Sequence, residues 1–168
     1  MKMSKLASTL VLTLALVLMV SGVGYSQAIT ETLSESHLVE RDVYVDCAAG
    51  GTGEMVHLTG YIHSLFHITE DPNGGVLVQF TGQPQGISGY GMTTGDLYQG
   101  TGITRDVEHI IDAYSEDSYS NVYTFVNNYR IIGQGSGNNL MIQDLFHFTI
   151  NAQGELTAWV ERSSETCQ

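Results

Sequence analysis

The sequence contains little positive charge, and none of it is clustered. The only two lysines, Lys2 and Lys5, lie at the very start, and beyond residue 28 four arginines stand against eighteen acidic residues, a net charge of −14. Nucleic-acid binding and attraction to anionic lipid both require clustered Lys and Arg. We therefore expect neither partner. The acid excess is interpreted as a solvated surface, with an acidic patch for cations or a basic partner as the alternative.

Long apolar runs are confined to the beginning of the chain, where Leu6–Val20 spans about fifteen residues. This run follows two lysines and precedes SGVGYSQA, whose small residues fit a cleavage after Ala28. A membrane anchor would need roughly twenty apolar residues, and no cysteine follows the run to carry a lipid. We therefore expect residues 1–28 to be a secretory signal peptide. The mature protein is expected to be extracellular or periplasmic, without a membrane anchor.

Cysteine is scarce, and the only two are Cys47 and Cys167. An even count in an oxidising compartment predicts one intramolecular disulfide between them. Neither cysteine stands in a known catalytic pattern with histidine, and the chain has no Gly-x-Ser-x-Gly motif, so nucleophilic catalysis is not indicated. The adjacent acids Glu116 and Asp117 lie in a polar, turn-like stretch and are interpreted as solvated.

Connections long enough for a crossover helix are also absent. Segments rich in β-branched and aromatic residues alternate with short clusters of Gly, Asn, Asp and Ser, which is typical of antiparallel strands joined by tight turns. One short helix within Thr104–Tyr114 is the alternative for that segment. We count eight strands: Val39–Cys47, Met55–Thr69, Val76–Thr81, Ile87–Thr93, Leu97–Asp112, Val122–Ile132, Leu140–Asn151 and Leu156–Glu161.

The predicted fold is all-β, with residues 39–168 forming one domain after a polar lead-in at residues 29–38. An eight-stranded antiparallel meander has exposed edges unless it closes into a small barrel, so we predict a barrel; a two-sheet β-sandwich is the alternative. In a closed meander the first and last strands are neighbours. A disulfide between Cys47 and Cys167 would then join the first and last strands where the barrel closes.

Glycine pairs occur in two of the expected strands. Gly89 and Gly91, and likewise Gly100 and Gly102, stand two residues apart and therefore share a strand face. Glycines on one face let a strand bend sharply or let another backbone approach closely, so we expect a strongly curved sheet. The glycine-rich stretch GQGSGNN lacks the spacing and the following helix of a dinucleotide site and is interpreted as a loop.

The stretch HLTGYIHSLFH carries three of the six histidines, among them His63 and His67. On a helix these two could grip one metal ion, but the alternation in MVHLTGYIHSLFHIT predicts a strand, on which they would stand roughly 13 Å apart. With a two-residue turn at residues 73–74, His67 would face Phe80 and His63 would face Pro84. The sequence therefore predicts no metal site, and it indicates no cofactor.

Polar residues interrupt two apolar strands, in YTFVNNYRIIG and IQDLFHFTI. On an outward face they would be ordinary surface residues. On the inward face of a barrel they would need hydrogen-bond partners, and such a cluster could orient a small ligand. The candidate ligand-binding residues are Asn128, Tyr129, Arg130 and His147, and no catalytic residue is assigned.

The segment FVNNYRIIGQGSGNNLMIQDLFHFTINAQGELTA, with TEDPNGG and GQPQGISGYGMTTGDLYQGTG before it, resembles a family of small secreted bacterial proteins of uncharacterised activity. The resemblance extends from Asp46 to Cys167, and RSSETC at the end fits the family's habit of finishing on a cysteine. It implies secretion and a β-rich domain, and it transfers no catalytic residue. The comparison with lipocalin-like or allene-oxide-cyclase-like barrels concerns architecture alone.

These observations favour a non-catalytic secreted β-barrel that binds a small, partly apolar ligand or a surface component. One alternative is a cofactor-free enzyme, isomerase-like or cyclase-like, with Arg130 or His147 acting inside the barrel as acid, base or anion clamp. The other is a structural or adhesive extracellular protein. A cavity of about 300 Å³ or more would separate the ligand hypotheses from the structural one. The sequence does not indicate an oligomeric state.

Overall fold

The computed structural model describes residues 27–111, 120–134 and 138–168. Nearly all of the expected signal peptide, residues 1–28, lies outside these ranges, and so do Glu116 and Asp117. The described residues form one sheet of seven strands and a single helical turn.

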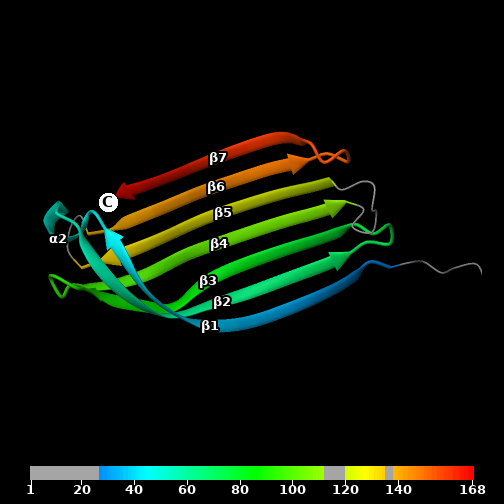
Figure 1. The fold of residues 1–168 in the computed structure, drawn as a ribbon. Coiled ribbons are helices and arrows are strands. Elements are labelled where there is room, and N and C mark those ends of the chain that lie inside the picture. Colours follow the sequence, from blue (N-terminus) through cyan, green and yellow to red (C-terminus); the bar gives the residue numbers. More distant parts are fainter. Residues whose placement is uncertain (1–26, 112–119, 135–137) are drawn as a thin grey trace, which may run out of the picture.

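Each strand of the sheet pairs antiparallel with the next along the chain (Figure 1). The strands hold 11 to 17 residues, so the longest extend over about 56 Å. The strands are β1 (Ile29–Val45), β2 (Glu54–Glu70), β3 (Val76–Gly91), β4 (Leu97–Ile111), β5 (Ser120–Gly133), β6 (Leu140–Ile150) and β7 (Leu156–Cys167), with the turn α2 (Ala48–Gly51) between β1 and β2.

The strands differ from the prediction at both edges of the sheet and in β3, and β7, expected to end at Glu161, extends to Cys167. Strand β1 begins at Ile29, so the expected polar lead-in at residues 29–38 belongs to the sheet and pairs with the second half of β2. Two of the eight expected strands are the single strand β3, which runs through the turn-like GQPQG. The pairing of β3 with β4 is interrupted between Gly82 and Ser88, and this irregular stretch accommodates Pro84, which has no N–H to donate.

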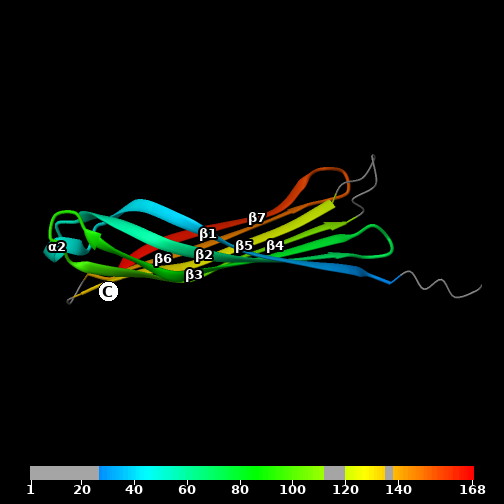
Figure 2. The ribbon, with the colours of Figure 1, turned by 90° about the horizontal axis from the view of Figure 1, so that it is seen from below.

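The all-β prediction is confirmed, but the predicted eight-stranded barrel is wrong. Strands β1 and β7 are the two edges of an open, seven-stranded sheet, and neither the barrel nor the alternative sandwich is formed by the described strands. Figure 2 shows a single curved layer, in which β1 turns over one face toward the α2 end. The edges are instead held together at one end of the sheet, where the sheet curls and a covalent bond joins them.

That bond is the predicted disulfide between Cys47 and Cys167, which is confirmed. The two Cα atoms lie 5.5 Å apart across a sequence separation of 120 residues. Cys47 follows β1 and Cys167 ends β7, so the disulfide joins the two edges of the sheet where it curls most.

The two faces of the sheet follow the alternation seen in β2. We call inner face the side that carries Leu58 and Ile62, and outer face the side that carries His63 and His67. The buried apolar residues all belong to the α2 end of the molecule. They are Val45, Cys47, Ala48, Val56, Leu58, Ile87, Tyr98, Ile131 and Leu140.

Glycines on the inner face permit the curl at this end. A Cβ at Gly60 would lie 2.5 Å from the Ile87 Cα atom, and one at Gly102 would lie 2.9 Å from the Tyr129 Cα atom. Gly102 also has a φ of +135°, which residues with a side chain rarely adopt. The close backbone approach that the sequence predicts is therefore present at Gly102.

The β2–β3 connection is longer than the expected two-residue turn, and the register of the two strands is shifted by one residue. The Asp71 N–H donates to the Gly75 carbonyl at 2.8 Å, which makes a five-residue loop that the Asp71 side chain stabilises through the Asn73 N–H at 2.6 Å. Because the register shifts by one residue, His67 pairs with Gln79 and His63 with Gln83, rather than with Phe80 and Pro84.

Candidate ligand-binding groove on the inner face

The inner face is hollowed beneath β1 into a groove of about 400 Å³, which we call the inner groove. Most of its lining is apolar, with four polar side chains among twelve. A concave, largely apolar surface with a few polar groups is the usual character of a small-molecule site. The lining residues come from β1 to β6: Val39, Arg41, Val43, Leu58, Ile62, Ile87, Thr104, Phe125, Asn127, Tyr129, Ile131 and Ile142.

Strand β1 supplies one wall of the inner groove. Val39, Arg41 and Val43 alternate along the strand and therefore share the inner face, where Arg41 pairs with the buried Leu58. β1 and β5 are not neighbours in the sheet. The two strands line one groove, with Tyr129 on the β5 side, because the sheet curls over itself at this end.

Two polar residues of the groove lining, Thr104 and Asn127, belong to a hydrogen-bonded row that runs from β4 to β7. The Thr104 hydroxyl donates to Asn127 Oδ1 at 3.0 Å, and Asn127 Nδ2 donates to Asp144 Oδ2 at 3.0 Å. The Ser163 hydroxyl donates to Asp144 Oδ1 at 2.6 Å. These hydrogen bonds fix the orientation of the Asn127 amide and occupy its polar atoms. The apolar side chains of the lining are therefore the main groups that can contact a bound molecule.

Tyr129 lies on the opposite wall, above the glycines of β4. A Cβ at Gly100 would collide with the Tyr129 hydroxyl, so the missing side chain makes room for the ring. Burial raises the pKa of Tyr129, and the positive charge of Arg41 opposes this rise, which places the two groups within electrostatic reach of each other. The phenol is therefore neutral at physiological pH.

Aromatic side chains cover the inner face beyond the groove, away from α2. The rings of Phe66 and Phe80 lie 4.9 Å apart, and those of Phe146 and Trp159 lie 4.5 Å apart. Trp159 is 53% exposed, because no second layer covers this half of the sheet in the described residues. The aromatic half continues the apolar surface of the inner groove along the strands.

Two acidic side chains interrupt the aromatic half. The Tyr123 hydroxyl donates to Asp106 Oδ2 at 2.9 Å, and Asn121 Nδ2 donates to Glu108 Oε1 at 2.6 Å. Burial raises the pKa of Asp106, although the hydrogen bond from Tyr123 counteracts it, and nearby Glu108 adds to the rise. Burial and the Asp106 charge together raise the pKa of Tyr123 to about 12.

The four ligand-binding candidates from the sequence do not lie together. Tyr129 lines the inner groove, whereas Asn128 and Arg130 flank it in β5 and therefore face the other side of the sheet. His147 also lies on the outer face, where its Nδ1 atom is 2.9 Å from the Thr124 hydroxyl. Arg130 is exposed.

The histidines of β2 line up on the outer face, as the predicted strand requires. His67 Nδ1 lies 2.9 Å from the Thr32 hydroxyl, and His63 Nδ1 lies 3.2 Å from the Ser36 hydroxyl. His57 is paired with Asp42 at 2.7 Å. Each histidine thus has a different partner on β1, and the partners of His63 and His67 belong to the expected lead-in at residues 29–38.

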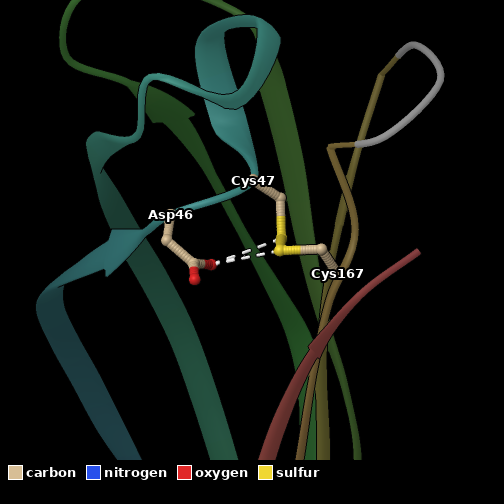
Figure 3. A group of neighbouring side chains, drawn as sticks. All are labelled: Asp46, Cys47 and Cys167. Atoms are coloured by element: carbon tan, nitrogen blue, oxygen red, sulfur yellow. Dashed lines mark hydrogen bonds between the residues drawn. A yellow bond between two sulfur atoms is a disulfide. The ribbon is translucent and has the colours of Figure 1, made fainter.

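The one place where three potential metal ligands converge in the described residues is the disulfide itself. Asp46 Oδ1 lies 3.3 Å from the sulfur atoms of both Cys47 and Cys167 (Figure 3). Disulfide sulfurs carry no proton, so these contacts are not hydrogen bonds in the oxidised protein. Because the thiolates are consumed in the bond, this group offers a metal ion only the Asp46 carboxylate.

A buried carboxylate fixes the loop that closes the α2 end. Glu54, 3% exposed, accepts hydrogen bonds from the Thr93 and Thr94 N–H groups at 3.0 Å each and from the Thr94 hydroxyl at 2.8 Å. The Tyr98 hydroxyl donates to it at 3.2 Å. Burial alone would raise the pKa of Glu54, but these hydrogen bonds outweigh it and lower the pKa.

Sequence reasoning missed Arg41, the basic residue of the inner groove. The alternation in LVERDVYV, with Val39, Val43 and Val45 on the same face as Arg41, is a signal that could have found it. A boundary between lead-in and strand at residue 39 interrupts this alternation and therefore conceals it.

Comparison with protein-family models, with curated proteins and with solved structures found no match for this chain. In the ranges that the structure describes, no helix combines the length and apolar character required to cross a membrane.

Proposed function

We propose that this protein is a secreted binding protein, and that its inner groove holds a small, largely apolar molecule. The observation that carries the proposal is the groove itself, whose volume of about 400 Å³ and mainly apolar lining match the sites that hold small molecules. The disulfide supports secretion, because such bonds form and persist in oxidising compartments.

The lining of the inner groove supports binding rather than catalysis. Its polar side chains are one Arg, one Thr, one Asn and one Tyr, and the Thr and Asn are engaged in the hydrogen-bonded row with Asp144. His57, His63, His67 and His147 lie on the outer face. His37 lies on the inner face, where it pairs with Ile62, but it is not part of the groove lining. The residues of the groove therefore supply shape and apolar contact, with a general base absent from its lining.

The test uses a matched pair of substitutions at adjacent positions of β1. Val39→Trp places an indole in the inner groove, whereas Leu38→Trp places the same group on the outer face, where Leu38 is 61% exposed. Binding of the neutral, apolar fluorophore N-phenyl-1-naphthylamine is measured by its fluorescence increase. We expect Val39→Trp to weaken binding by about tenfold or more, since filling a pocket excludes its occupant, and Leu38→Trp to leave it unchanged.

Native mass spectrometry of protein purified from its own culture medium identifies the natural occupant, as a reproducible mass above that of the polypeptide. Equal binding of the fluorophore by wild type and Val39→Trp, or a lack of binding by wild type, would contradict the proposal.

A further inference from the structure

Arg41 is the one arginine on the inner face of the described sheet. Arg105 and Arg162 pair with outer-face residues of their neighbouring strands, and Arg130 alternates with the groove residue Tyr129. Arg41 instead pairs with the buried Leu58 and lines the inner groove. The sheet thus places a single guanidinium at the edge of an otherwise apolar hollow.

No carboxylate of the described residues neutralises this guanidinium at salt-bridge distance. The ion pairs within the described ranges are those of His57, with Asp42 at 2.7 Å and Glu40 at 3.7 Å, on the outer face. Asp144, which lies beside the lining residue Asn127, accepts hydrogen bonds from Asn127 and Ser163. Arg41 is exposed and is therefore accessible to a charge brought by a ligand.

We propose that the ligand of the inner groove is an anionic amphiphile, with a carboxylate that binds Arg41 and an apolar chain that lies along the groove. This inference rests on the proposed function and names the chemical class of its ligand. A planar guanidinium binds a carboxylate through two parallel N–H···O bonds, which fixes the orientation of the head group as well as its position. Val39 and Val43 flank Arg41 on the same strand and begin the apolar wall that receives the chain.

The charges of the inner face determine which way such a ligand lies. Arg41 is the one charged side chain in the groove lining. The acidic residues of the inner face lie outside the lining and repel an anionic head group; they include Glu35 on β1, Asp106 and Glu108 on β4, Asp144 on β6 and Glu165 on β7. The head group therefore stays at Arg41, at the β1 edge of the groove and in contact with solvent. The chain extends over Ile62 and Ile142 toward the aromatic half.

The test compares three ligands that share one chain and differ in the head group: decanoate, decan-1-ol and decyltrimethylammonium. Binding to the full mature chain is measured by calorimetry at constant ionic strength. We expect decanoate to bind at least about tenfold more tightly than decan-1-ol, because a hydrogen bond to a charged group contributes that much or more. Decyltrimethylammonium should bind most weakly.

Substitutions then test whether Arg41 causes the preference for decanoate over decan-1-ol. Arg41→Gln should weaken decanoate binding by about tenfold or more and leave decan-1-ol unchanged, and Arg41→Lys should retain part of the preference. Arg105→Gln, an exposed outer-face control with the same change in net charge, should retain all of it. Equal affinity of wild type for the three ligands, or an unchanged preference in Arg41→Gln, would overturn this inference while the proposed function stands. Failure of all three ligands to bind would overturn both.

Discussion

At the scale of single residues, the polar side chains divide into those that hold the fold and those that face an occupant. Glu54 belongs to the first group, since all of its known hydrogen bonds connect the start of β2 to the β3–β4 turn and to Tyr98. Arg41 belongs to the second, since it lines the groove without a carboxylate partner among the described residues. This division predicts which substitutions affect stability and which affect binding.

Glu54→Gln should destabilise the fold by about 1–3 kcal/mol at neutral pH, because it removes the charged acceptor from several buried donors. The pKa of Glu54 is lowered in the folded protein. Its contribution is therefore complete above the ordinary value of 4.5 and is lost as the pH falls through the folded pKa. The difference in melting temperature between wild type and variant should be largest near pH 7 and shrink below about pH 4.5.

Glu35→Gln provides the control for Glu54→Gln, since Glu35 is exposed and the change in net charge is the same. Its melting temperature should follow that of wild type at each pH. A constant difference between wild type and Glu54→Gln down to pH 3 would contradict the role assigned to the ionised carboxylate.

At the scale of elements, glycine determines where the long strands bend. Gly102→Ala should lower the free energy of unfolding by roughly 3–5 kcal/mol, because the new Cβ adds backbone strain and also clashes with Tyr129. Gly86→Ala is the matched comparison: its φ is +64°, but no atom lies within 4 Å of the added Cβ. Gly86→Ala should lower the free energy of unfolding by the backbone strain alone, roughly 1–2 kcal/mol. Equal losses in urea unfolding of the two variants would show that close backbone approach is unimportant at Gly102.

The elements were largely predictable from the sequence because their period is local. Alternation in β2 and β5 and the turn clusters between strands depend on neighbouring residues only. The continuity of β3 through Pro84 was not predictable in this way, because it depends on how β2 and β4 accommodate an irregular segment. The register of the β2–β3 turn depended on the Asp71 side chain, which favours a longer loop than the Asn-Gly pair suggests.

At the scale of the whole molecule, the decisive feature is an open sheet whose two edge strands are joined at one end by a disulfide. Strand counting could not predict this, because closure depends on the curl that glycines and inner-face side chains produce together. The candidate site was predictable to the same extent. Tyr129 is indicated by the polar residues that interrupt an apolar strand, whereas Arg41 requires knowledge of which face curls inward. The disulfide was predictable because it needed only the cysteine count and the compartment.

The disulfide should account for a large part of the global stability. It closes a loop of 120 residues, for which the chain-entropy model gives roughly 4–5 kcal/mol. Reduction should lower the melting temperature of wild type by about 10 °C or more. The double variant Cys47→Ala, Cys167→Ala should melt at the lower temperature and show no further response to the reductant. Unchanged melting of wild type after complete reduction would contradict the role of this bond in holding the edges together.

The claim that the inner groove is the binding surface is tested most directly by methyl NMR. Isoleucine and leucine methyl groups of the mature protein report on both faces, with Ile62, Ile142 and Leu58 in the groove and Ile132 and Leu145 on the outer face. On titration with N-phenyl-1-naphthylamine, the structure predicts shifts in the three groove residues and none in the two outer ones. Shifts confined to Ile132 and Leu145, or no shifts at saturating probe, would contradict it.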